Sequence, residues 1–153
     1  MRLPVLCGGF ALAFAAGLFA ARIVPSADAQ TAPAPLTPRI VNLLTMTDDE
    51  IGPLVNNTDL RSRTLVATEH GTVAVQSGNV FKHYHAETDE IQYILDGTGS
   101  FWLGDREVQV KPGDLIIIPR TTHHAGSRAT TGRFRAIAIK LPPQKPNDTH
   151  RVP

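Results

Sequence analysis

The sequence predicts an all-β fold, a barrel or sandwich of short strands, on three observations. From Arg61 onward, short segments rich in β-branched and aromatic residues follow one another at even spacing. Turns that carry Gly, Asp or Pro, such as Gly104-Asp105 and Pro112-Gly113-Asp114, separate these segments. No stretch with a helical period is long enough for a helix bundle. With 153 residues, the chain has the size of one domain.

Residues 1–29 are predicted to be a secretory signal peptide and not part of the fold. Arg2 precedes an apolar run over residues 3–21, and Ala27-Asp28-Ala29 is a small-x-small cleavage site. An uncleaved membrane anchor is the alternative, because the run approaches the ~20 residues that a spanning helix needs. Glycines within the run and the cleavage site favour removal. We therefore expect the mature protein in the periplasm or secreted, with no stable membrane span.

Composition excludes several classes of function for the mature chain. The only cysteine, Cys7, lies in the predicted signal peptide, so disulfides and thiolate metal ligands are not expected. The whole chain has a net charge of +1 and its basic residues are scattered along the sequence. The sequence therefore has no basic cluster of the kind that binds nucleic acid. A small molecule or a metal ion is the kind of partner that remains.

Residues 30–60 are predicted to form a leader with one short helix. Residues 30–38 contain three prolines and read as a flexible leader. The segment Arg39 to Leu44 is apolar enough to be a first strand or to lie across the barrel. Thr47-Asp48-Asp49-Glu50 matches a capping box, which predicts a short helix from there to about Leu54.

Residues 61–141 are predicted to form the β-barrel, and residues 142–153 a flexible tail. The tail begins Pro142-Pro143, and proline cannot donate to a sheet ladder. The predicted strands of the barrel are 63–68, 72–76, 80–85, 91–95, 99–103, 106–110, 115–118, 123–127 and 134–141.

Histidines and a glutamate near the middle of the chain indicate a metal site. His83 and His85 are alternate residues of one predicted strand, so their side chains share a face of the sheet. Glu90 follows after a turn, and a second histidine pair, His123-His124, lies on a later segment. Imidazole and carboxylate ligands without sulfur suit Mn, Fe, Co, Ni or Zn.

Two segments together resemble the cupin family. Gly78-x4-His83-x-His85-x4-Glu90-x6-Gly97 resembles the first cupin motif, and Gly113-x5-Pro119-x4-His124 resembles the second. The resemblance implies a double-stranded β-helix, which is a small jelly-roll barrel. It also implies one divalent metal ion held by His83, His85, Glu90 and His124.

Three positions qualify this resemblance. Alignment favours His124 over His123 as the ligand, and alternation would point His123 to the opposite face. Thr121 stands where the family prefers Gly, so the turn there is expected to differ, since Gly serves positions with positive φ. Arg128 stands where the second motif often ends in Asn.

Three further residues are candidates for the pocket wall. Gln92 shares the face of Glu90 by alternation and is expected to hydrogen-bond a ligand or the substrate. Phe81 shares the face of His83. Arg128 lies four residues after His124, on the same face if the strand is regular, where a guanidinium would hold an anionic substrate. The alternative for Arg128 is a solvated residue at the end of a strand.

Two functions are consistent with the sequence. The first is an exported mononuclear-metal enzyme that acts on a small oxygenated organic molecule, and the resemblance extends to dioxygenases, decarboxylases and isomerases. An oxidoreductase is included among these. The second is a non-catalytic module that binds a metal or a small ligand. The resemblance also suggests a homodimer, with the apolar segment Ile40 to Leu44 as the candidate contact.

Overall fold

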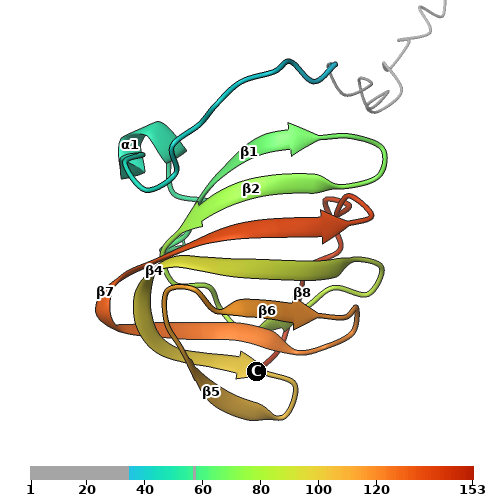
Figure 1. Cartoon of the computed structure of the whole chain (residues 1–153). Helices are drawn as coiled ribbons and strands as arrows, with labels where there is room; N and C mark the ends of the chain where they lie inside the picture. The colour runs from blue at the N-terminus through green and yellow to red at the C-terminus, as the bar shows by residue number, and fades with distance from the viewer. Residues whose placement is uncertain (1–34, 57) are drawn as a thin grey trace, which may run out of the picture. The chain divides into compact units, whose positions relative to one another are not determined.

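Two long strands, β4 (Asp89–Leu103) and β7 (His124–Leu141), organise the fold of the computed structural model (Figure 1). The structure describes residues 35–56 and 58–153, so the predicted signal peptide and the start of the leader lie outside the described residues. β4 and β7 run antiparallel and pair from Asp89↔Leu141 to Leu103↔His124. Both strands bend near their middle, and each therefore contributes to both layers of the barrel.

The shorter strands pair with the two halves of this frame. β1 and β2 form a hairpin that pairs with the second half of β7, while β6 pairs with the first half of β4 and β5 with the second half. β3 pairs with the first residue of β7 and with β8. The result is the expected double-stranded β-helix. The bounds of the short strands are β1 Arg61–Ala67, β2 Thr72–Ser77, β3 His83–Tyr84, β5 Arg106–Val110, β6 Leu115–Ile118 and β8 His150–Arg151.

Each long strand joins two segments that the sequence predicts as separate strands. Residues 91–95 and 99–103 both belong to β4, and residues 123–127 and 134–141 belong to β7 apart from His123. The glycine-containing turns between them bend the strands instead of ending them. At Gly99, a Cβ atom would lie 2.0 Å from the carbonyl oxygen of Arg128, so the two backbones can approach there only because Gly has no side chain. The predictions for β5 and β6 are confirmed.

The hydrophobic core fills the space between the two layers. Side chains alternate along the strands, so that Ile116 and Ile118 of β6 are buried while Leu115 and Ile117 are exposed. The same alternation on β4 and β7 continues from core residues into the polar end of the barrel, where the site lies. The core cluster consists of Ile94, Phe101, Val110, Ile116, Ile118, Ala125, Phe134 and Ala136.

The predicted short helix is confirmed as α1 (Asp48–Ile51). The hydroxyl of Thr47 accepts from the backbone N–H of Glu50, and the Glu50 carboxylate accepts from the Thr47 N–H, which completes the capping box. The helix ends at Ile51, with Gly52 as its C-cap, before the expected Leu54. The preceding segment Arg39 to Leu44 forms no strand and lies against β1, where Arg39 donates to the Leu65 carbonyl. In the described part of the chain, no helix is long and apolar enough to cross a membrane.

The structure corrects the expectation of a flexible C-terminal tail. Residues 150–151 form β8, which pairs with β3 at His83↔Arg151 and Tyr84↔His150. The Val152 N–H donates to the Lys82 carbonyl at 3.0 Å, and Asp148 is only 3% exposed. Without β8, the short strand β3 would have unpaired backbone N–H and C=O groups on this edge. The pairing with β8 gives them hydrogen-bond partners. The prolines at the start of the segment prevent continuation of β7 but not this return.

Candidate metal centre

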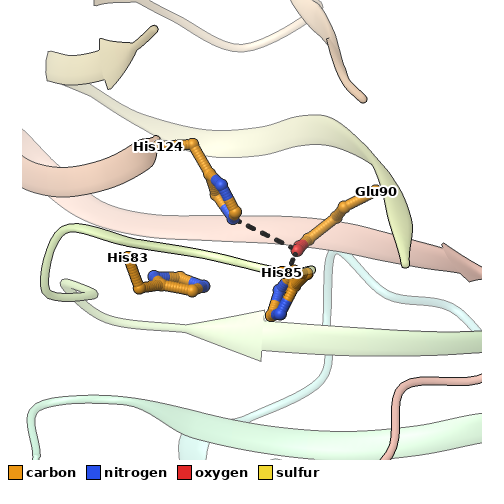
Figure 2. A group of neighbouring side chains, drawn as sticks. All are labelled: His83, His85, Glu90 and His124. Carbon is orange, nitrogen blue, oxygen red and sulfur yellow. Dashed lines mark hydrogen bonds and ion pairs between the residues drawn. The ribbon is translucent and has the colours of Figure 1, made fainter. Parts of the chain in front are cut away.

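Four side chains from three strands converge at the polar end of the barrel (Figure 2). His83 lies on β3, His85 directly follows this strand, Glu90 is the second residue of β4, and His124 is the first residue of β7. The pairing of His83 with His124 brings the two motifs together. One potential ligand atom from each residue lies within 4.8 Å of the others, and all four residues are buried. The structure thus brings together the ligand set implied by the resemblance.

Backbone carbonyls hold each of the three imidazoles through its Nδ1 atom. His83 Nδ1 lies 2.9 Å from the Phe81 carbonyl oxygen, and His124 Nδ1 lies 2.9 Å from that of Thr122. His85 Nδ1 is bonded to the carbonyl oxygen of Asp148. Because a carbonyl can only accept, Nδ1 is the donor in each ring, and in the neutral imidazole the lone pair is then on Nε2. This is the arrangement in which histidine ligates a metal through Nε2.

The Nε2 atoms of His85 and His124 face a carboxylate and not a hydrogen-bond donor among the described residues. His85 Nε2 lies 3.0 Å and His124 Nε2 lies 3.4 Å from the same oxygen, Glu90 Oε2 (Figure 2). His124 Nε2 is fully buried and has no hydrogen-bond partner within the described residues. Lone pairs that face a carboxylate oxygen repel it unless a proton or a cation lies among them. The donor set therefore fits a divalent cation.

The charge states of the cluster also suit a cation. Burial, together with the neighbouring His124, lowers the pKa of His83 to about 3, so this imidazole is neutral at physiological pH. Burial alone would raise the pKa of Glu90. The adjacent imidazoles of His124 and His85 and the ammonium of Lys140 outweigh burial and hold that pKa well below its usual range. An ionised Glu90 carboxylate and a neutral His83 imidazole are the forms that bind a metal.

A cavity of about 490 Å³ opens onto the cluster. His83 and Glu90 form part of its wall, and so do the predicted pocket residues Gln92 and Phe81. The Gln92 amide donates to Glu90 Oε1 at 2.8 Å, which leaves Oε2 to face the imidazoles. The Phe81 ring packs against His83 with 5.4 Å between ring centroids. The cavity is large enough for a small organic molecule.

Of the two alternatives for Arg128, the structure shows the solvated residue and not the pocket residue. Its side chain is exposed and does not line the cavity. The pairing with β4 slips by one residue between Trp102↔Ala125 and Ser100↔Arg128, and Ala125 and Gly126 both have positive φ. A one-residue bulge reverses which face the following residues occupy. Ser127, not Arg128, is therefore turned inward.

The choice of His124 over His123 agrees with the structure. His124 is completely buried in the cluster, whereas His123 is exposed. The His123 ring lies outside the site and packs on Tyr84 at a centroid distance of 5.5 Å. The two adjacent histidines therefore have different environments and provide a matched pair for mutagenesis.

Thr121 adopts the backbone conformation for which a glycine would be suited. Its φ is 68°, in the left-handed region that β-branched residues rarely occupy. The expectation of a different turn is not met, because the threonine takes the positive φ itself. Its N–H donates to the His85 carbonyl at 2.6 Å, which connects the turn before His124 to the residue directly after β3.

We expect Thr121→Gly to stabilise the fold by about 1 kcal/mol, because a left-handed non-glycine residue costs roughly 1–3 kcal/mol and glycine loses part of that gain through unfolded-state entropy. Thermal unfolding should show a midpoint higher by a few degrees. Thr122→Gly is the control, since Thr122 has no positive φ, and it should lower the midpoint. A lower midpoint for Thr121→Gly would contradict the strain argument.

Sequence reasoning missed four residues of the site. Lys140 lies opposite Glu90 on β7 and lines the cavity, and Arg151, Gln144 and Asp148 come from the C-terminal segment. Lys140 had a signal: it continues the inward alternation of Ala136 and Ala138. The other three had none, because their positions depend on the return of the segment to β3.

The barrel and the cluster define a double-stranded β-helix protein with the side chains of a metal centre. Residues 71–140 match the family model described as a cupin domain, and this part of the chain is a cupin domain. A solved structure from Klebsiella pneumoniae, an uncharacterized conserved protein with a double-stranded beta-helix domain, has a TM-score of 0.58 and 16% identity. The match covers 76% of this chain and 100% of that chain, and it supports the fold.

Several of the relatives that the chain resembles in sequence are dioxygenases. An acireductone dioxygenase of Leptospira biflexa is 42% identical over 62 residues, which are 37% of this chain and 35% of that protein. Quercetin 2,3-dioxygenase of Bacillus subtilis is 29% identical over 83 residues, 52% of this chain and 23% of that protein. The chain thus spans about a third or less of the length of these relatives.

Proposed function

We propose that this protein is a mononuclear-metal cupin enzyme that acts on a small oxygenated organic molecule, with dioxygenase chemistry as the first candidate. His83, His85, Glu90 and His124 would hold one divalent ion. The observation that carries the proposal is the set of three Nδ1 bonds to backbone carbonyls, which leaves the Nε2 lone pairs of the three rings for a metal ion, those of His85 and His124 within 3.4 Å of one carboxylate oxygen. A structural metal site is usually closed by its protein ligands, often with sulfur. This cluster has no sulfur and lies beside an open cavity.

The chemistry supplied by the bound ion would be Lewis-acid activation of substrate oxygens, or activation of dioxygen if the ion is redox-active. The residues of the chain contribute position and exclusion of water. Gln92 fixes the Glu90 carboxylate through Oε1. Phe81 covers one side of His83, and Lys140 places a positive charge 3.8 Å from Glu90 Oε2.

The dioxygenase assignment rests on the names of the relatives. The chain is similar to an acireductone dioxygenase over 62 residues and to quercetin 2,3-dioxygenase over 83 residues. Decarboxylase and isomerase chemistry remain alternatives for the same site, because one fold supports several reactions. A protein that binds metal or a small ligand without turnover is the outcome that the experiment below separates from an enzyme.

The test is elemental analysis of protein purified from its native compartment, followed by oxygen consumption with small acids, enediols and phenolic compounds. We expect about one equivalent of Mn, Fe, Co, Ni or Zn per chain and oxygen uptake with at least one substrate class when the ion is iron or manganese. A bound metal without turnover of any compound would favour the binding module. A folded protein with no metal above background would refute the proposal.

We also propose that the enzyme is exported and dimeric. Export is supported by the apolar run and the cleavage site, which predict a mature N-terminus at Gln30 that mass spectrometry can check. A homodimer would cover Ile40 and Leu44, which are 101% and 70% exposed, and the outward residues Leu115 and Ile117 of β6, 59% and 65% exposed. A monomer mass in solution would exclude the dimer.

A further inference from the structure

The cavity beside the cluster carries an excess of positive charge. Lys140 and Arg151 line it, and Glu90, the one carboxylate among its lining residues, faces the imidazoles. Without any metal, the lining therefore has two cations against one anion, and a divalent ion would add to this excess. A concave site with one sign of charge concentrates ligands of the opposite sign.

Lys140 has donors available for a ligand. Its side chain is 16% exposed, and within the described residues its ammonium donates only to the Gln144 side-chain oxygen. Glu90 Oε2 lies 3.8 Å away, beyond hydrogen-bond distance. An ammonium has three N–H donors, so at least one of those of Lys140 is free to bond a group in the cavity.

Arg151 is held in place by an aromatic face instead of an acid. Its guanidinium carbon lies 4.6 Å from the centroid of the Phe81 ring, and Arg151 forms no ion pair in the part of the chain that the structure describes. Its backbone is fixed by the pairing with His83. A guanidinium that is stacked through its plane keeps its N–H edge free for a carboxylate.

Apolar side chains form another part of the same wall. Val55, Leu60, Val80 and Phe81 line the cavity together with the two cations. The two cations favour a molecule with a carboxylate, and these side chains give its apolar part a surface to pack on.

We propose that the site takes a small carboxylate, whose anionic group is bound by Lys140 and Arg151 next to the cluster. This inference names the substrate class of the proposed enzyme and rests on that proposal. It places the anion-binding arginine on the C-terminal segment, at residue 151, and not at residue 128 on β7.

The test measures binding of three carboxylates, acetate, malonate and benzoate, and of their neutral amides, by NMR titration of the full chain in chelator-treated and zinc-loaded forms. We expect the chelator-treated protein to bind benzoate and to discriminate against benzamide. Arg151→Gln and Lys140→Met should each weaken benzoate binding about tenfold, the value of one charged hydrogen bond. Arg128→Gln is the matched control and should change nothing, because its side chain lies outside the cavity.

Three results would overturn the inference. They are no binding of any carboxylate, equal binding of acid and amide, and unchanged benzoate affinity in Arg151→Gln. Arg151→Gln is the decisive variant, because Arg151 is exposed and its substitution should not disturb folding. This holds even if Lys140→Met destabilises the fold. Elemental analysis is independent of these titrations. Carboxylate binding without metal binding would therefore refute only the proposed metal enzyme, and the reverse would refute only this inference.

Discussion

His124→Ala should abolish stoichiometric metal binding, whereas His123→Ala should leave it intact. The two histidines are adjacent in sequence, but His124 is buried in the cluster and His123 is exposed and packs on Tyr84. Removal of one of four ligands should weaken the metal affinity by roughly 100-fold or more, since even residues that only orient ligands contribute 10–100-fold. The measurement is metal content after dialysis against a weak chelator, together with turnover of any substrate found for the wild-type protein.

The pair also controls for general damage to the fold. Thermal unfolding of both chelator-treated variants should show a folded barrel. If both variants keep the metal, the cluster is not the binding site. If His123→Ala loses it while His124→Ala does not, the assignment of the inner histidine is wrong.

Removal of residues 142–153 should weaken both the metal site and the fold. The carbonyl of Asp148 holds His85 Nδ1, and the Asp148 carboxylate accepts from the backbone N–H of Ala86 at 2.7 Å and from that of Glu87. A chain that ends at Leu141 loses these acceptors and leaves β3 with an unpaired edge. Because a ligand that loses its orienting partner costs 10–100-fold in metal affinity, we expect a loss of this size. A loss of stability of about 1–3 kcal/mol should accompany it.

A point variant separates the two effects. Asp148→Ala retains the main-chain carbonyl but removes the carboxylate that holds the turn after His85, so it should lower stability and reduce metal affinity less than the truncation does. Asn147→Ala is the control, because residue 147 is exposed and has no hydrogen bond among the described residues. Isothermal titration with zinc and thermal unfolding measure both quantities. Wild-type zinc affinity in the truncated chain would show that the C-terminal segment has no part in the site.

The ligand set could be predicted because it depends on local patterns. Alternation places His83 and His85 on one face, and the turn that follows returns Glu90 to them. Only the pairing of β3 with the start of β7 is a tertiary fact, and the spacing of the second motif indicated it. The same alternation failed at Arg128, because one bulged residue after His124 reversed the faces of the strand. A bulge that has Ala125 and Gly126 at positive φ has no firm signature in a single sequence.

The C-terminal segment shows the other limit of local reasoning. Pro142 and Pro143 correctly predict the end of β7, yet they contain no information about where the chain goes next. Its return is determined by a partner 66 to 68 residues earlier, the unpaired edge of β3. Lys140 is an intermediate case, since its inward position follows from Ala136 and Ala138 but its closeness to Glu90 follows from the register of β4 and β7.

Because backbone carbonyl groups hold the three imidazoles, the metal site can form before an ion binds. They belong to the backbone of the folded barrel and position the rings without help from an ion. The binding site thus exists as soon as the chain has folded, and ion uptake needs little further ordering of the protein. A preassembled set of nitrogen and oxygen donors selects poorly among first-row metals. The supply of ions at the place of folding would then have a large part in deciding which metal the protein carries.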